Sequence, residues 1–98
     1  MNKVIQGKAT VVRSRRDYPK IKSETILISK ETHPDLVLVI RNIKGIVVEV
    51  DNRLCHAAIV AREFGIPILM GVKEAAKRFK TGDRVAVDFE RKTIRKMK

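Results

Sequence analysis

The chain has 98 residues, of which 44% are apolar, so it is long enough for one compact domain and too short for two. Its 22 lysine and arginine residues against 11 aspartate and glutamate residues give a formal charge of +11, which predicts an anionic partner, substrate or surface. A single cysteine excludes a disulfide scaffold, and no apolar run is long enough to span a bilayer. The polar first residues are unlike a signal peptide, so we expect a cytoplasmic protein.

The first third of the chain predicts two strands joined by a basic surface segment. Val4 to Val12 is rich in β-branched residues and predicts a strand, in which Gly7 marks a bulge or a close backbone approach. The segment from Arg13 to Lys22 contains a proline and has little periodicity, which predicts a surface loop or a hairpin connection. Thr25 to Ser29 predicts a second, short and buried strand.

The next segment gives conflicting local signals. Leu36 to Ile40 favours a strand by propensity, whereas Pro34 stands where a helix can begin without a backbone N–H. The polar residues that follow, and Gly45 after them, favour a helix that ends at this glycine. We therefore expect a buried helix here, with His33 as a residue at the helix entry rather than a ligand.

The rest of the chain alternates strands and helices. Gly45 to Val50 predicts a buried strand, and His56 to Phe64 has good helix formers with apolar residues at helical spacing. Gly65 is expected to end this helix, and Pro67 prevents its continuation. A short strand, a basic amphipathic helix and two closing strands are predicted at Ile66 to Met70, Lys73 to Phe79, Arg84 to Val87 and Thr93 to Met97. This order predicts a single α/β domain with helices packed on a small sheet.

A short loop, Asp51 to Cys55, leads from a predicted strand directly to His56 at the expected start of a helix. The free backbone N–H groups and the positive dipole end at such a position favour a phosphoryl group. A neutral imidazole is an available nucleophile at cell pH and can hold phosphate as a covalent intermediate. On spacing alone, however, a capping or packing role for His56 is the simpler interpretation.

The stretch CHAAIVAREFGIPILMGVKEAAKRFKTGDRVAVD, which begins at Cys55, resembles the mobile phosphohistidine domain of phosphoenolpyruvate-utilising enzymes. The similarity is greatest to the phosphoenolpyruvate synthase and pyruvate phosphate dikinase branch of that family. It is tightest from Gly45 to Asp88 and looser from Val4 to Lys44, so we expect residues 1–98 to form one such domain. The resemblance implies a swivelling β/β/α fold with His56 as the phosphoryl acceptor.

The resemblance also implies roles for residues near His56. Arg53, Cys55 and Arg62 are candidates for contact with the phosphoryl group, the last from about one and a half turns along the same helix. A solvated residue paired with Glu63 is an equally good interpretation of Arg62. One cysteine and two distant histidines predict no metal site.

The family also implies how such a domain works with others. It implies no cofactor bound by this domain, and a phosphoryl donor, phosphoenolpyruvate or ATP, that is bound by a partner protein. That partner would carry a nucleotide-binding or a phosphoenolpyruvate/pyruvate-binding domain, so the chain is not expected to be a complete enzyme alone.

The loop before the histidine departs from the family's pattern. The family has two glycines, a variable residue, a small hydroxyl or amide residue and another variable residue, and here these are Asp51, Asn52, Arg53, Leu54 and Cys55. Asp and Asn tolerate a left-handed backbone better than most residues. Leu54 cannot donate a hydrogen bond, and Asp51 adds negative charge where a dianionic group would arrive. Arg53 offers a positive charge that can offset Asp51.

Three functions from different classes follow from these observations. The first is a stand-alone phosphoryl carrier that uses His56 and is phosphorylated by a separate protein. The second is a degenerate relative that serves as a non-catalytic binding or regulatory module. The third is a basic nucleic-acid-binding domain, which is the least favoured because aromatic residues are not interleaved with the basic clusters. The carrier is slightly favoured over the binding module.

Overall fold

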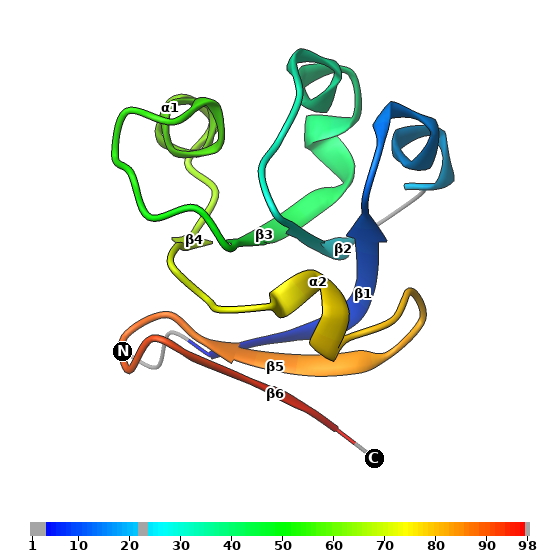
Figure 1. Cartoon of the computed structure of the whole chain (residues 1–98), viewed down its shortest axis with the longest axis vertical. Coiled ribbons are helices and arrows are strands. Elements are labelled where there is room, and N and C mark those ends of the chain that lie inside the picture. Colours follow the sequence, from blue (N-terminus) through cyan, green and yellow to red (C-terminus); the bar gives the residue numbers. More distant parts are fainter. Residues whose placement is uncertain (1–3, 22–23, 98) are drawn as a thin grey trace.

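The structure is a computed structural model that describes residues 4–21 and 24–97. Six strands form one sheet in the order β4-β3-β2-β1-β5-β6 (Figure 1). The strands are β1 (Val4–Val12), β2 (Thr25–Ser29), β3 (Ile43–Val48), β4 (Ile68–Leu69), β5 (Arg84–Asp88) and β6 (Thr93–Lys96). The helices are the 3-10 helices η1 (Arg15–Lys20) and η2 (Pro34–Asn42), and the α-helices α1 (His56–Phe64) and α2 (Ala75–Arg78). The mixed α/β domain predicted from the sequence is confirmed.

Strand β1 belongs to two parts of the sheet at once. Its first residues run antiparallel to β5, whereas the residues from Lys8 onward run parallel to β2. The sheet therefore curls, and β5 and β6 lie below the plane of the other strands (Figure 1). Pairing is regular through Gly7, which lies opposite Val85, so no bulge occurs there. The irregularity in the sheet lies instead in β2, between Thr25 and Ile26.

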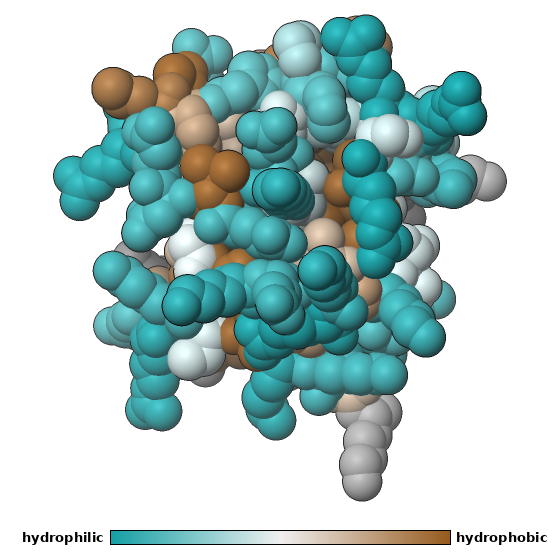
Figure 2. Space-filling view, viewed as in Figure 1, coloured by the Kyte–Doolittle hydropathy of each residue, from teal (hydrophilic) through white to brown (hydrophobic). Residues whose placement is uncertain are grey.

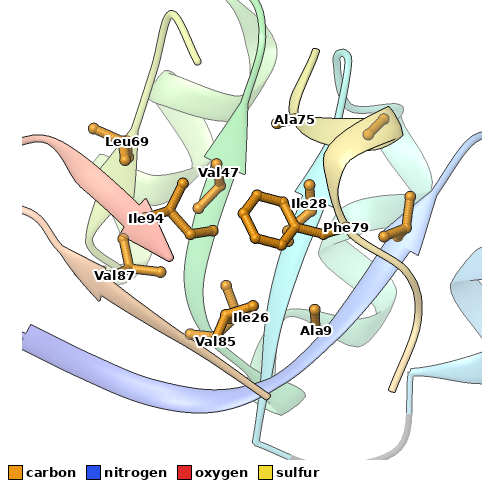
Figure 3. Close-up of a cluster of buried hydrophobic side chains, with 12 residues drawn as sticks. Ala9, Ile26, Ile28, Val47, Leu69, Ala75, Phe79, Val85, Val87 and Ile94 are labelled. Atoms are coloured by element: carbon orange, nitrogen blue, oxygen red, sulfur yellow. The ribbon is translucent and has the colours of Figure 1, made fainter. Parts of the chain in front are cut away.

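Apolar side chains fill the space on both faces of the central strands. On one face, η1, η2 and α1 cover residues that include Leu27, Ile46 and Val48. On the other face, β5, β6 and α2 cover Ile28 and Val47, with Phe79 between the layers (Figure 3). Because both faces are covered, the residues of β2 form an unbroken buried run rather than an alternating one. The layers are those of the β/β/α fold that the family resemblance implied.

The segment between β1 and β2 differs from the prediction. A hairpin connection is wrong because β1 and β2 are parallel, and parallel strands need a longer crossover. Helix η1 forms part of this crossover. Its carboxylate at Asp17 accepts hydrogen bonds from the N–H groups of Arg13 at 2.8 Å and Ser14 at 3.2 Å. The predicted loop also included Lys22, which lies outside the described residues.

The predicted helix after β2 is present but ends earlier than expected. It is the 3-10 helix η2, it ends at Asn42, and His33 is its N-cap, as expected for an entry residue. The prediction that Gly45 ends it is wrong, because this glycine lies inside β3 opposite Ile26. A Cβ at this position would lie 3.2 Å from both Ile26 and Phe89. The side chains of Ile26 and Phe89 lie so close to the backbone of Gly45 that they leave little room for a Cβ, and this explains the glycine at this position.

Helix α1 has the predicted bounds, and Gly65 ends it with φ of 67° and an N–H bonded to the carbonyl of Ala61. Strand β4 and helix α2 are shorter than predicted. Helix α2 begins late because Glu74, just before it, has φ of 55°, which is not helical. Within the described residues, no helix is long and apolar enough to cross a lipid bilayer.

Gly71 is expected to be more sensitive to substitution than Gly65. Both have positive φ, 74° and 67°, but a Cβ at Gly71 would lie 3.2 Å from the Asp51 side chain, whereas Gly65 faces open space. We expect Gly71→Ala to lower the free energy of unfolding by about 2–3 kcal/mol and Gly65→Ala by about 1 kcal/mol. Urea unfolding of both variants measures the difference. Equal losses would show that the contact with Asp51 contributes nothing.

Candidate functional site

His56 lies at the edge of the sheet where the parallel strands β1, β2 and β3 end. The segments that leave these strands carry η1, η2 and α1, which stand side by side above this edge (Figure 1). Ligands of open α/β sheets bind at the carboxyl ends of the strands. The topology therefore places the first residue of α1 where a functional group is expected.

The imidazole of His56 is half-buried and has one hydrogen-bond partner among the described residues. Its Nδ1 lies 3.0 Å from Oγ1 of Thr32, which follows β2. If Nδ1 carries the ring proton, it donates to this hydroxyl, and Nε2 then keeps its lone pair. The contact orients the ring and is compatible with this tautomer, but it does not select it, because a hydroxyl can either accept from Nδ1–H or donate to an unprotonated Nδ1.

A cavity of about 200 Å³ adjoins His56. It is lined by Glu31, Thr32, Val48, Val50, Cys55, His56 and Ala57. Most of these side chains are apolar or small, and Glu31 is the carboxylate among them. A second cavity, of about 380 Å³, also reaches Glu31 and extends toward α2. The smaller cavity beside His56 and the larger cavity therefore share Glu31 in their linings.

The loop before His56 is shaped by Asn52. The side-chain oxygen of Asn52 accepts the N–H of Leu54 at 2.9 Å, and its carbonyl accepts the N–H of Cys55 at 3.0 Å. Asn side chains commonly stabilise turns in this way. Neither Asp51 nor Asn52 has positive φ. The loop consequently reaches the helix without the backbone freedom of the two glycines in the family's pattern.

The structure brings together only some of the residues that the sequence singled out. Cys55 is the N-cap of α1, is half-buried and lines the smaller cavity beside His56, but its side chain makes no capping hydrogen bond. Arg53 and Arg62 are exposed and lie outside the lining of that cavity. Leu54 is 80% exposed. The ion pairs of the described residues lie elsewhere, so Arg53 forms no ion pair with Asp51, although its charge can still offset that of the carboxylate.

Sequence analysis missed Thr32 as a site residue. It lies just before His33 and Pro34, which were interpreted as the entry to a helix, and the 24 residues that separate it from His56 give no local pattern. A signal was nevertheless present. Both residues follow neighbouring buried strands, and if these strands are parallel, their carboxyl ends place the two residues at the same edge.

Metal binding has no support in the described part of the chain. No group of three His, Cys, Asp or Glu side chains there is arranged to hold a metal ion.

Comparison with known proteins gives relatives that are several times longer than this chain. A probable phosphoenolpyruvate synthase from Pyrococcus horikoshii is 39% identical over 90 residues, which cover 92% of this chain and 11% of the relative. A rifampicin phosphotransferase from Bacillus subtilis is 38% identical over 84 residues, which cover 86% of this chain and 10% of the relative. The chain thus spans about a tenth of the length of these relatives.

A solved structure and a family match agree with this result. The NMR structure of Enzyme I superposes with a TM-score of 0.64 and 27% identity, over 76% of this chain and 31% of that chain. Residues 21–92 match the family described as "PEP-utilising enzyme, mobile domain", a range that includes Thr32, the loop and all of α1. The chain belongs to the family of mobile domains of phosphoenolpyruvate-utilising enzymes.

Proposed function

We propose that the chain is a phosphoryl carrier that is phosphorylated on Nε2 of His56. The observation that supports this most is the 3.0 Å contact between Nδ1 and Oγ1 of Thr32. It orients the ring, and in this proposal the hydroxyl accepts the proton of Nδ1, which leaves the lone pair of Nε2 available to a phosphoryl donor. Family membership supports the same chemistry, because enzymes of this family use phosphoenolpyruvate.

The transfer step needs only groups that this site holds. The Nε2 lone pair attacks the phosphorus of the donor, a nitrogen–phosphorus bond forms, and the bond from phosphorus to the leaving oxygen breaks. The proton on Nδ1 stays in its hydrogen bond to Thr32 throughout. The first N–H groups of α1 and its positive dipole end favour the dianionic product at this position. Transfer to an acceptor is the reverse of the same step.

The donor and the acceptor are proposed to be held by partner proteins or domains. In this proposal the donor is phosphoenolpyruvate or ATP, bound by a nucleotide-binding or a phosphoenolpyruvate/pyruvate-binding partner, and this domain binds no cofactor. One relative is named as a synthase of phosphoenolpyruvate and the other as a phosphotransferase that acts on rifampicin. The carrier chemistry is therefore proposed to be common to both, with the acceptor selected by the partner.

The surface around α1 fits contact with such a partner. Leu54, Ile59 and Phe64 are exposed by 80%, 43% and 50% on this helix and the loop before it. Figure 2 shows brown atoms over this corner of a face that is otherwise mostly teal. The charge of +11 promotes encounter with an acidic partner, since exposed charges act over roughly 8 Å at physiological salt. Arg53 and Arg62 remain proposed contacts to the phosphoryl group once a partner has closed over it.

The second candidate function is a binding module that no longer transfers phosphate. It is favoured by Leu54, which stands in place of a hydroxyl or amide residue, and by the carboxylate of Glu31 in the lining of the cavity. Incubation of the protein with cell extract and phosphoenolpyruvate or ATP, followed by intact-mass measurement, separates the two functions. The carrier gains the mass of one phosphoryl group, whereas the binding module gains none.

Leu54→Thr is expected to raise the phosphorylation rate only a few-fold. A hydroxyl here can donate to a phosphoryl oxygen, but at an exposed position water competes for the bond, and its net value stays near 1 kcal/mol, about fivefold in rate. Single-turnover phosphorylation of Leu54→Thr, with Leu54→Ala as the matched control, measures the effect. If both variants react equally fast, the hydroxyl at this position is irrelevant to transfer.

A further inference from the structure

The tyrosine of η1 holds the residue next to Thr32. Tyr18 is only 2% exposed, and its hydroxyl oxygen accepts the backbone N–H of His33 at 2.9 Å. The same hydroxyl lies 3.5 Å from Nδ1 of His33, and the two rings meet edge to face with centroids 5.9 Å apart. Residue 33 is thus held through both its backbone and its ring.

A second buried hydroxyl holds the other neighbour of Thr32. Oγ of Ser29 is close to the carbonyl oxygens of Glu31 and, at 2.9 Å, Val12. Ser29 is 2% exposed and is the last residue of β2. Thr32 therefore lies between two residues whose backbone groups are bonded to buried side chains. Its own hydroxyl is free to meet the imidazole of His56.

Helix η1, which carries Tyr18, is itself anchored. The backbone N–H of Arg13, which bonds to the carboxylate of Asp17, holds the pKa of that carboxyl below its usual range. Burial raises the pKa of Tyr18 above that of an ordinary tyrosine, so its hydroxyl keeps its proton at neutral pH. The ring packs in the same cluster as Leu36 and Val12. The position of the Tyr18 hydroxyl, which contacts His33, is therefore fixed by the packing of its ring in the core and by the anchoring of η1.

We propose that Tyr18 is a positioning residue for His56: by fixing the backbone of His33, its hydroxyl holds Thr32 against Nδ1 and so maintains the tautomer with a free Nε2. The consequence for phosphoryl transfer rests on the proposed function of His56, whereas the effect on the tautomer does not. No part of this arrangement was visible in the sequence, where the segment around Tyr18 predicted a loop.

The test is the tautomer of His56, measured by 15N NMR on histidine-labelled, unphosphorylated protein at a pH where the ring is neutral. In the wild type we expect Nδ1–H to predominate. Tyr18→Phe keeps the buried ring and removes only the hydroxyl, and it should lower the ratio of Nδ1–H to Nε2–H by about fivefold. Thr25→Val is the matched control, because it removes a buried hydroxyl bonded to Thr10 at 2.7 Å, at the opposite end of β2.

A double variant shows whether Tyr18 acts through Thr32. Thr32→Val should also lower the tautomer ratio, and adding Tyr18→Phe to it should change nothing further. An unchanged tautomer in Tyr18→Phe, an equal change in Thr25→Val, or an undiminished effect in the double variant would overturn the proposal. If Tyr18→Phe does not fold, the wild-type protein alone still tests the proposal. A predominant Nε2–H tautomer of His56 contradicts the proposal. A predominant Nδ1–H tautomer, together with slow hydrogen exchange of the His33 amide, supports it. If His56 is never phosphorylated, the tautomer result stands independently.

Discussion

His56→Ala is expected to abolish phosphoryl uptake completely, because it removes the proposed nucleophile. The other histidine of the chain provides the matched control. His33→Ala loses its ring contact with Tyr18 but keeps the proposed nucleophile and the backbone N–H that Tyr18 accepts, so it should still take up one phosphoryl group. The measurement is incorporation of labelled phosphate from phosphoenolpyruvate or ATP in the presence of cell extract.

The chemical stability of the label identifies the bond. A phosphoramidate is labile in acid and stable in base, whereas a phosphoserine or phosphothreonine is stable in acid. His56 is half-buried at the start of a helix and outside the main clusters, so circular dichroism of His56→Ala should be unchanged. Full labelling of a folded His56→Ala protein would mean that another residue accepts the phosphoryl group.

Thr32→Val is expected to slow phosphorylation by about tenfold or more, because a half-buried Nδ1–H left without a partner costs roughly 1–3 kcal/mol. Valine has nearly the shape of threonine, so the change removes the hydroxyl and little else. Thr32→Ser keeps the hydroxyl and should recover most of the rate. Single-turnover rates with a saturating partner measure the effect on the transfer step itself.

The Thr32 variants also test how the domain differs from a weakened relative. Leu54 stands where the family has a hydroxyl or amide residue, so the hydroxyl of Thr32 is the one that remains beside His56. If the site needs a hydroxyl, the loss of Thr32 should strongly lower the phosphorylation rate. Rates for Thr32→Val that match the wild type would show that the ring needs no orientation. The same result would remove the main support for Nε2 as the nucleophile.

The parts of the fold that the sequence predicted best are those with local signals. Helix α1 has the predicted bounds because good helix formers lie between the short loop at its start and Gly65 at its end. The strands β1 and β2 have the predicted bounds because they are rich in β-branched residues, which are buried throughout β2 and in the last part of β1.

The parts that the sequence did not predict depend on distant contacts. Helix η1 was expected to be a loop because its order comes from Tyr18 in the core and from Asp17, and neither produces a periodic pattern. Gly45 was interpreted as a helix end, whereas the side chains of Ile26 and Phe89, on other strands or turns, explain it. Such contacts appear only when the chain is folded.

The candidate site was predictable only in part for the same reason. His56 was recognisable from its place at the start of a helix and from the family resemblance. Thr32 was not, because its contact with His56 depends on the pairing of β2 with β3. Arg53 and Arg62 were expected near the phosphoryl group from the family resemblance, which does not show that both residues are exposed here.

The central claim is tested most directly by locating the phosphoryl group on the protein. The chain, labelled with 15N at histidine, is incubated with cell extract and phosphoenolpyruvate or ATP, purified, and examined by NMR for coupling between phosphorus and nitrogen. The account predicts coupling to Nε2 of His56, with Nδ1 still protonated beside Thr32. Phosphate on Nδ1 of His56, phosphate on any other residue, or no phosphorylation with either donor would contradict it.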